Sequence, residues 1–207
     1  QSGLSRFVFL LIGSVALIVS AEPVFELSAD GLGNTKDPAM NGKPHGTVAV
    51  LEGVVPAVEF DGKGFVLFGN PAVLQIDTAL TIAVWIMNAP NETANEQYIV
   101  SKWSWNLYTD MRDNTNYPVF ETRNADNDGW DSLRSSQKMG FNRWNHVVAV
   151  FDGERREKTL YLNGQLVGRH ETDERLGGVK EQPLYIGRYA KGRQQFRGRI
   201  SGVRIFD

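Results

Sequence analysis

Short apolar runs alternate with turn-forming residues along most of the chain, and this spacing predicts strands. Beyond residue 54, runs of four to eight residues rich in Val, Ile, Leu, Phe and Tyr are separated by Gly, Asp and Asn, as expected of β-strands joined by turns. Thr159–Leu162 and Gln165–Gly168 flank Asn163-Gly164, a dipeptide favoured in two-residue hairpin turns because both positions need positive φ. No stretch repeats apolar residues at the helical period for three turns. The pattern therefore predicts an all-β chain with two packed antiparallel sheets.

The first residues have the pattern of a signal peptide. Arg6 precedes an uncharged apolar stretch, Phe7–Val19, which ends at the small residues Ser20 and Ala21. This stretch is shorter than the roughly 20 apolar residues that a membrane-spanning helix needs. We therefore expect cleavage after residue 21, with residues 22–207 as one domain that does not span a membrane; an uncleaved anchor is the alternative.

Charge and cysteine content limit the partners and the cellular location expected for this domain. The formal net charge is −2 at pH 7 and becomes −3 without Arg6, so nucleic acid is not an expected partner. The chain has no cysteine, and an exported domain without disulfides must be stabilised by its core. We expect a secreted, extracellular or cell-surface protein of bacterial type.

A series of short motifs follows one another in a specific order through the domain. They are Asp37–Val48, Val58–Gly62, Leu80–Trp85, Ile99–Lys102, Trp144–Val147, Leu160–Gly164, Leu184–Gly187 and Phe196–Ile205. Together they resemble the laminin-G-like domains of bacterial secreted proteins, within the concanavalin-A-like lectin/glucanase superfamily. The resemblance covers essentially all of residues 22–207 and implies a two-sheet antiparallel jelly-roll β-sandwich. Ser201-Gly202 stands where the family pattern has Asp-Glu, which puts a structural calcium site there in doubt.

Fold alone does not fix the function of such a domain. Family members include sugar binders, adhesion modules and domains that accompany carbohydrate-active enzymes. Superfamily glucanases resemble one another in a Glu-x-Asp-x-x-Glu strand motif, because retaining hydrolysis needs two carboxyl groups about 5 Å apart; this chain lacks the motif, and it also lacks Gly-x-Ser-x-Gly. We predict a non-catalytic carbohydrate-binding, adhesion or accessory domain, with a glycan and a fused or neighbouring carbohydrate-active enzyme as expected partners. A glycan hydrolase or lyase, or a purely structural cell-surface module, stays open.

Tryptophan is the residue type that points to a sugar site. Flat aromatic faces stack on sugar rings, whereas cores also use Trp, and the chain has five of them. Trp85 and Trp144 lie within apolar strands, so we expect both in the core. The predicted binding patch combines Trp130 of an acidic loop with residues of adjacent strands: Trp103, Trp105, Tyr108, Asp110, Arg112, Arg123 and Trp130. The alternative is that Trp103 and Trp105 cover a sheet edge.

The acidic loop also resembles the first half of an oxygen-ligand calcium loop. Asn124, Asp126 and Asp128 alternate before Gly129, but Ser135 occupies the position where an EF-hand has a bidentate Glu. Calcium is therefore the one cofactor we consider, with Asn124, Asp126 and Asp128 as its ligands, and a polar turn is the alternative reading.

Two segments concentrate positive charge, Arg155-Arg156 and Lys191–Arg199. Such segments are commonly solvated faces. Guanidinium groups also pair with sulfate or uronate, so contact with an anionic polysaccharide is the second interpretation.

Overall fold

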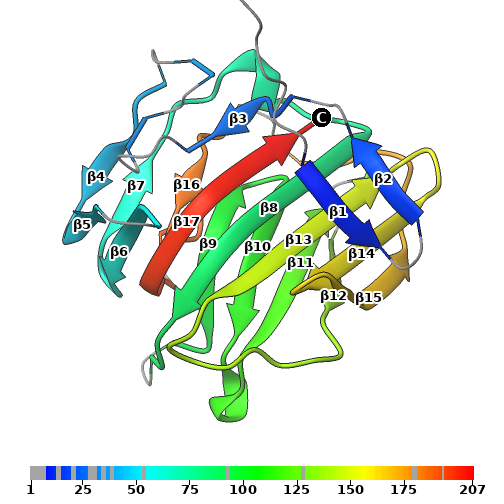
Figure 1. Ribbon diagram of the computed structural model, residues 1–207. Coiled ribbons are helices and arrows are strands. Elements are labelled where there is room, and N and C mark those ends of the chain that lie inside the picture. The colour runs from blue at the N-terminus through cyan, green and yellow to red at the C-terminus, as the bar shows by residue number, and fades with distance from the viewer. Residues whose placement is uncertain are drawn as a thin grey trace, which may run out of the picture.

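The computed structural model describes residues 8–12, 15–19, 22–27, 32–33, 36–37, 40–52, 55–91, 94–126, 129–178, 181–192 and 194–207. Two antiparallel sheets lie face to face, with β17, β8 and β13 in front of β9, β10 and β11 in Figure 1. The predicted two-sheet antiparallel jelly-roll sandwich is confirmed. None of the described residues belongs to a helix that is long and apolar enough to cross a membrane.

One sheet has seven strands, in the order β12-β11-β10-β9-β16-β7-β4. Their bounds are Trp130–Arg134 (β12), Tyr117–Arg123 (β11), Trp105–Asp110 (β10), Glu96–Lys102 (β9), Tyr185–Ile186 (β16), Phe65–Leu67 (β7) and Lys43–His45 (β4). This seven-stranded sheet carries most of the predicted binding residues.

The other sheet has eight strands, in the order β15-β14-β13-β8-β17-β6-β5, with β3 paired to β17. Their bounds are Gln165–Glu171 (β15), Glu157–Leu162 (β14), Asn145–Asp152 (β13), Ala79–Asn88 (β8), Arg197–Phe206 (β17), Ala57–Asp61 (β6), Val48–Leu51 (β5) and Phe25–Glu26 (β3). Two short 3-10 helices, η1 (Ala72–Leu74) and η2 (Arg112–Asn114), lie in connections. The predicted hairpin turn is confirmed, since Asn163 has φ 50° and Gly164 φ 81°.

The segment expected to be a signal peptide contains β1 (Val8–Ile12) and β2 (Val15–Val19), which pair with each other. Residues 1–7, 13–14 and 20–21 lie outside the described residues. Cleavage after residue 21, and the domain boundary that depends on it, stay predictions.

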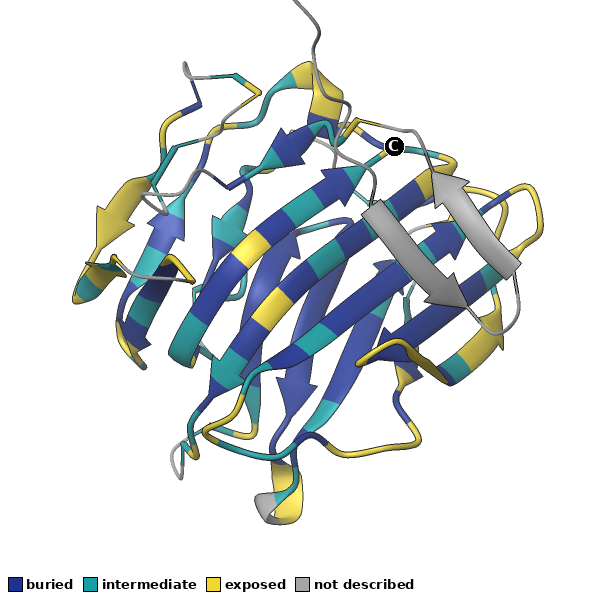
Figure 2. Ribbon diagram, viewed as in Figure 1, coloured by how far each residue is buried: buried dark blue, intermediate teal, exposed yellow. Residues whose placement is uncertain are grey.

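Alternation along the strands places the core between the sheets. In β8 the side chains of Ile82, Val84 and Ile86 are fully buried, while those between them face outward. Figure 2 shows the result as dark bands along β8 and β17. Trp85 was expected in the core and this expectation is wrong: its exposed fraction is 45%, because Val84 and Ile86 take the inward positions. Trp144, just before β13, is only half-buried.

A bulge in β9 sets which side chains reach the outside of the seven-stranded sheet. Leu107 pairs with Val100, but the next residue, Tyr108, pairs with Tyr98. The extra residue, Ile99, is buried in the core together with Val100. The bulge therefore turns Tyr98 to the outer face, opposite Tyr108.

Candidate functional site

Strand register brings most of the predicted patch onto one face. Asn106 lies opposite Ser101 on β9 and Glu121 on β11, and Arg123 lies opposite Trp130 on β12. Because every second residue shares a face, the outer side of the seven-stranded sheet carries Trp103, Tyr108, Asp110, Arg123 and Trp130. We call this surface the aromatic face.

Five rings on the aromatic face form a continuous series. Tyr108 stacks on Tyr98 with ring centroids 4.7 Å apart, and Tyr189 lies 4.6 Å from Tyr98 on its other side. Tyr189 is 6.3 Å from Trp103, which meets Trp130 edge to face at 5.6 Å and 81°. Both tryptophans are partly exposed, so the series ends in two indole rings that a ligand can reach.

Cations lie over these indoles. The guanidinium carbon of Arg123 is 4.2 Å from the centroid of Trp130 and 4.8 Å from that of Trp103. The ammonium of Lys191 lies 3.8 Å from the Trp103 ring. These are the distances of cation–π contacts, which hold the charged groups in place. Arg123 Nη1 also donates to the Gly129 carbonyl (3.5 Å).

A chain of hydrogen bonds crosses the strands on the same face as the rings. The Ala190 N–H donates to Ser101 Oγ (3.0 Å), and the Ser101 hydroxyl donates to Asn106 Oδ1 (2.6 Å). Asn106 Nδ2 donates to Glu121 Oε2 (3.2 Å), and the Ser132 hydroxyl donates to Glu121 Oε1 (2.9 Å). The network ties the loop that carries Tyr189 and Lys191 to β9, β10, β11 and β12.

Burial changes the acid–base behaviour of the face. Burial raises the pKa of the Glu121 carboxyl, which the hydrogen bonds from Ser132 and Asn106 only partly offset. Burial likewise raises the pKa of Glu96 and of the hydroxyls of Tyr98 and Tyr108. Both tyrosines therefore stay protonated and can donate hydrogen bonds at neutral pH.

Asp110 and Arg112 face the same side but bind each other. Arg112 donates to both carboxylate oxygens of Asp110 at 2.8 and 3.0 Å, and Arg134 adds a contact at 3.0 Å. Burial acts to raise the pKa of Asp110, but the Arg112 and Arg134 guanidiniums hold it below its ordinary value. The Asp110 carboxylate is committed to these two arginines, whereas Arg112 remains largely exposed.

The prediction that Trp105 contacts a ligand is wrong. Its ring has an exposed fraction of 0% and lies inside the core, because Trp105 pairs with Lys102 and Thr122 on the inward side of the sheet. The prediction overlooked Tyr189 and Lys191, which reach the face from the loop after β16. The one signal for them was the basic segment beginning at Lys191.

The calcium expectation is only partly within the described residues. Asp128 lies outside them, while the Asn124 N–H donates to the Gly129 carbonyl (3.2 Å) and the Ala125 N–H donates to Asp173 Oδ2 (2.9 Å). Among the residues that the structure describes, no group of three or more His, Asp or Glu side chains could hold a metal ion. Calcium stays a prediction.

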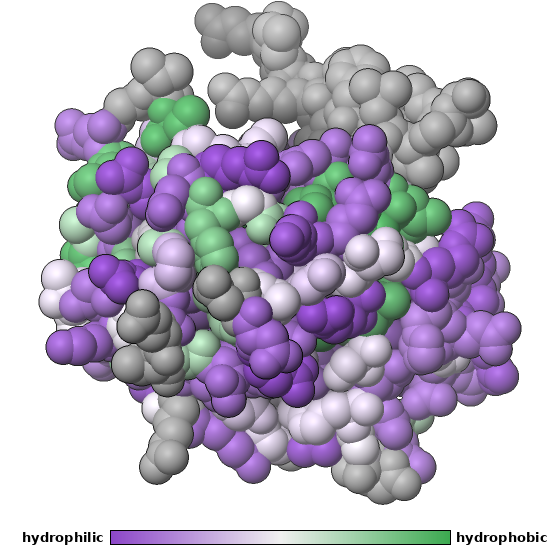
Figure 3. Space-filling view, turned by 90° about the horizontal axis from the view of Figure 1, so that it is seen from below, coloured by the Kyte–Doolittle hydropathy of each residue, from purple (hydrophilic) through white to green (hydrophobic). Residues whose placement is uncertain are grey.

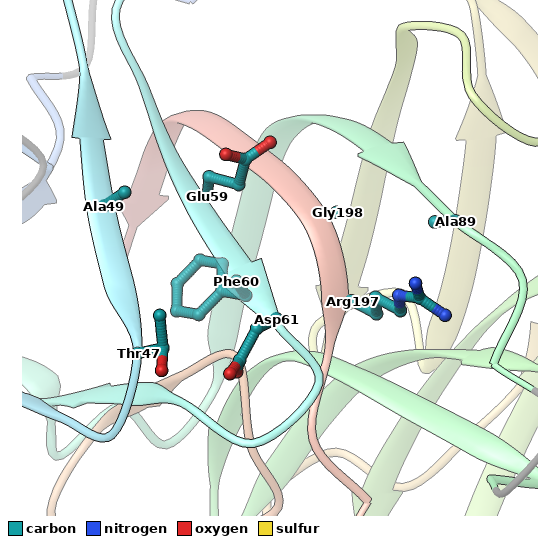
Figure 4. Close-up of a pocket in the computed structure, with 8 residues that line it drawn as sticks. All are labelled: Thr47, Ala49, Glu59, Phe60, Asp61, Ala89, Arg197 and Gly198. Atoms are coloured by element: carbon teal, nitrogen blue, oxygen red, sulfur yellow. The ribbon is translucent and has the colours of Figure 1, made fainter.

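A second concave region lies at the end of the sandwich, away from the rings. A hollow of about 230 Å³ is lined by Thr47, Ala49, Glu59, Phe60, Asp61, Ala89, Arg197 and Gly198 (Figure 4). Figure 3 views this end from below and shows a largely hydrophilic surface. The Asp61 carboxylate accepts the N–H groups of Lys63 and Gly64, and these hydrogen bonds hold its pKa below the ordinary value. The lining contributes no exposed aromatic ring, so this hollow suits a sugar ring less well than the aromatic face.

Comparison with known proteins places the fold in a family. A family model described as the concanavalin A-like lectin/glucanases superfamily matches residues 60–207. No curated protein matches the chain in sequence.

Solved structures of the same fold include several binding domains. Domain 4 of AbnA, a GH43 extracellular arabinanase from Geobacillus stearothermophilus in complex with arabinotriose, superposes with a TM-score of 0.69 at 14% identity, over 90% of this chain and 93% of that one. The binding domain of Paraclostridial Mosquitocidal Protein 1 gives 0.69 at 15%, over 89% of this chain and 48% of that one, so the chain spans about half of it. The Ruminococcus gnavus IT-sialidase CBM40 bound to α2,3-sialyllactose gives 0.54 at 17%, over 65% and 78%.

Proposed function

The chain belongs to the concanavalin A-like lectin/glucanases superfamily, and from this membership we propose that it is a non-catalytic carbohydrate-binding domain that acts outside the cell. The observation that carries the proposal is the pair of partly exposed indoles, Trp103 and Trp130, at the end of a five-ring series. A rigid sheet with aromatic rings beside polar groups is the usual way to bind sugars through both their C–H faces and their hydroxyls.

The surrounding groups suit this chemistry. The two indole planes are nearly perpendicular, so they present a bent platform rather than a flat one. Arg123 and Lys191 lie over the indole rings and can donate to a ligand, and Tyr189 extends the surface over β9. Hydrogen bonds within the sheet fix the platform beforehand, which lowers the entropy cost of binding.

The solved structures support the same class of ligand. The arabinanase domain is in complex with arabinotriose and the sialidase domain is bound to α2,3-sialyllactose. At 14% and 17% sequence identity, these similarities concern the fold alone. The aromatic face of this chain supplies the residue-level argument.

Glycan-array binding of the purified protein tests the proposal. We expect binding that is lost in Trp130→Ala and retained in Trp85→Ala, because Trp85 is a more exposed tryptophan on the other sheet. Both variants must melt as the parent does. Equal loss in the two variants, or no glycan bound at all, would contradict the proposal.

An enzyme is the alternative, and one observation favours it. The Glu121 carboxyl lies on the aromatic face with its pKa raised by burial, which is the condition of proton donors in glycoside hydrolysis. Release of reducing ends from a bound glycan, abolished in Glu121→Gln with binding retained, would establish the enzyme. Binding without any turnover supports the non-catalytic domain.

Export, calcium and an enzymatic partner complete the proposal. An N-terminus at Glu22 in protein collected from the medium or cell surface would establish export and cleavage, and intact residues 1–21 would contradict them. Repeating the array with calcium and with a chelator tests the calcium loop, with Asp126→Asn as the matched variant. A carbohydrate-active enzyme encoded in or beside the same reading frame would support an accessory role.

A further inference from the structure

The aromatic face continues beyond the five rings to the other edge of the sheet. Tyr185 lies opposite Ser101 on one side and Leu67 on the other, and His45 lies opposite Phe65. Because Leu67 and Phe65 are two residues apart, all these side chains share the face of Ser101. The Phe65 and His45 rings are stacked, with centroids 4.7 Å apart, and Phe65 lies 6.1 Å from Tyr185.

A third cation lies over this second group of rings. The Arg188 guanidinium carbon is 4.2 Å from the Phe65 centroid and 5.2 Å from that of Tyr185. Arg188 and Lys191 belong to the same loop, so residues 188–191 place one cation toward β7 and the other toward Trp103. Gly187 begins this loop with φ 85°, and a Cβ there would lie 2.6 Å from the ring of Phe60 on β6, so the start of the loop packs closely against the core.

Arg123, Lys191 and Arg188 thus form a row of ring-stacked cations across the strands. The rings beneath these cations extend from Trp130 on β12 to Phe65 on β7, five strand spacings apart, roughly 24 Å at about 4.8 Å each. None of the three cations forms an ion pair with a carboxylate of the described residues, in contrast to Arg112 and Arg134, which bind Asp110. Arg123 Nη1 and Arg188 Nε donate to the carbonyls of Gly129 and Tyr189 (3.5 and 3.2 Å), and the other N–H groups of the row are available to an external anion.

The carboxylates of the same face are already occupied. Asp110 accepts from two arginines, and Glu121 accepts from Asn106 and Ser132. Glu96 accepts from Gln194 Nε2 (2.9 Å) and the Tyr98 hydroxyl (3.4 Å). Asp110 is thus paired with cations, whereas Glu96 and Glu121 accept from neutral groups and oppose an anionic ligand when they are ionised.

We propose that the ligand of the aromatic face is a linear acidic polysaccharide, bearing carboxylate or sulfate groups, that lies across the strands from Trp130 to Phe65 with its acidic groups on Arg123, Lys191 and Arg188. This inference rests on the proposed function of the same face and names its ligand class. A guanidinium held flat on a ring keeps its N–H edge free for two parallel bonds to a carboxylate or sulfate. A neutral sugar that stacks on the same indole faces has to displace Arg123 or Lys191 first.

Matched pairs of polysaccharides test the proposal. We expect the protein to bind dextran sulfate over dextran, or polygalacturonate over its methyl ester, by about tenfold or more in affinity. Preference in the first pair alone identifies sulfate, and preference in the second pair identifies uronate. Affinity should fall when salt is raised from about 0.05 M to about 0.5 M, because added ions screen the contacts.

Charge-removing variants locate the ligand on the face. Arg123→Gln and Arg188→Gln, at opposite ends of the row, should each weaken binding of a long acidic chain by about tenfold. Arg155→Gln, in an exposed turn on the other sheet, should bind as the parent does. The affinity for an acidic disaccharide should fall in at most one of Arg123→Gln and Arg188→Gln, because so short a ligand cannot reach both ends of the row.

The outcomes separate this inference from the proposed function. Equal binding of neutral and acidic members, lost in Trp130→Ala, overturns the acidic ligand and leaves glycan binding intact. Acidic binding that Arg155→Gln weakens as much as Arg188→Gln overturns the proposed path across the sheet. No binding to any glycan overturns both.

Discussion

The ammonium group of Lys158 lies 2.9 Å from the carboxylate of Asp131 and joins the two sheets at their open edge. Lys158 comes from β14 with an exposed fraction of 0%, and it also donates to the Asp131 carbonyl at 2.6 Å. His170 and Thr172 contact the same carboxylate from the end of β15 and just beyond it. Since Asp131 follows Trp130 directly, this ion pair fixes the edge strand that presents the outer indole.

Replacing Lys158 by Met should therefore affect both stability and binding. Removing one member of a buried ion pair costs about 3–5 kcal/mol, because the Asp131 carboxylate is left without its main partner. Urea denaturation measures this loss, and glycan affinity below the melting transition should fall as β12 loosens. Lys138→Met, on an exposed loop, should stay within about 0.5 kcal/mol of the parent; an equal effect in both variants would contradict this role for Lys158.

The two neighbouring tryptophans should respond in opposite ways. Trp105→Ala removes a fully buried ring and should destabilise the fold by about 3–5 kcal/mol, with glycan affinity of the folded fraction unchanged. Trp103→Ala should cost about 1 kcal/mol in stability and lose most of the binding. Denaturation and titration on the same preparations check both, and a binding loss confined to Trp105→Ala would reverse the assignment.

This contrast shows how far the sequence determines the site. The turns and apolar runs define the strands, and Trp130 and Arg123 are correctly placed on one face. Whether Trp103 and Trp105 face outward or inward cannot be deduced by continuing the alternation of β9 into β10, because the turn at Trp103-Ser104 interrupts it. In β8 the residues on both sides of Trp85, from Ile82 to Met87, are all apolar, so the pattern does not mark Trp85 as an outward residue.

The other residues of the aromatic face are brought there by contacts between segments that are distant in sequence. Tyr189, Lys191 and Arg188 are far in sequence from Trp103. Hydrogen bonds from Ala190 to Ser101 and from Gly187 to Ile99 hold their loop on β9. Tyr98 reaches the face because of a bulge, which the local pattern does not reveal. The sequence therefore predicts the kind of residue at the site better than the full set.

The buried ammonium of Lys102 should make the free energy of unfolding depend on pH. Lys102 has an exposed fraction of 1%, and its ammonium donates to Asn70 Oδ1 and the Gln182 carbonyl, both at 2.8 Å. Burial lowers its pKa from 10.5 to about 8. Between these values the unfolded chain binds more protons than the folded one, so the free energy of unfolding should rise with pH from this group by about 3 kcal/mol at most. Urea denaturation of the parent and Lys102→Met between pH 7.5 and about 10 measures the difference; parallel curves would contradict it.

If the ligand is the proposed acidic polysaccharide, the Glu121 carboxyl should make its affinity depend on pH. Burial raises the pKa of its carboxyl, and the negative charge of Glu96 adds to the effect. As the pH falls from neutral toward this raised pKa, Glu121 takes up a proton and stops repelling an anionic chain beside Arg123. Affinity for the acidic polysaccharide should therefore increase by a factor of about 3 to 10 as the pH falls, provided that the ligand's own groups stay ionised.

Glu121→Gln isolates this contribution, because Gln keeps the shape and an oxygen acceptor for Asn106 or Ser132 while it carries no charge at any pH. The variant should bind an acidic chain at neutral pH as tightly as the parent does at low pH, and its affinity should change less with pH. A sulfated chain is the better ligand for this titration, since its groups stay ionised throughout. If parent and variant show the same pH profile, the charge on Glu121 does not act on the ligand, and Glu96, whose pKa is also raised by burial, becomes the carboxyl to replace.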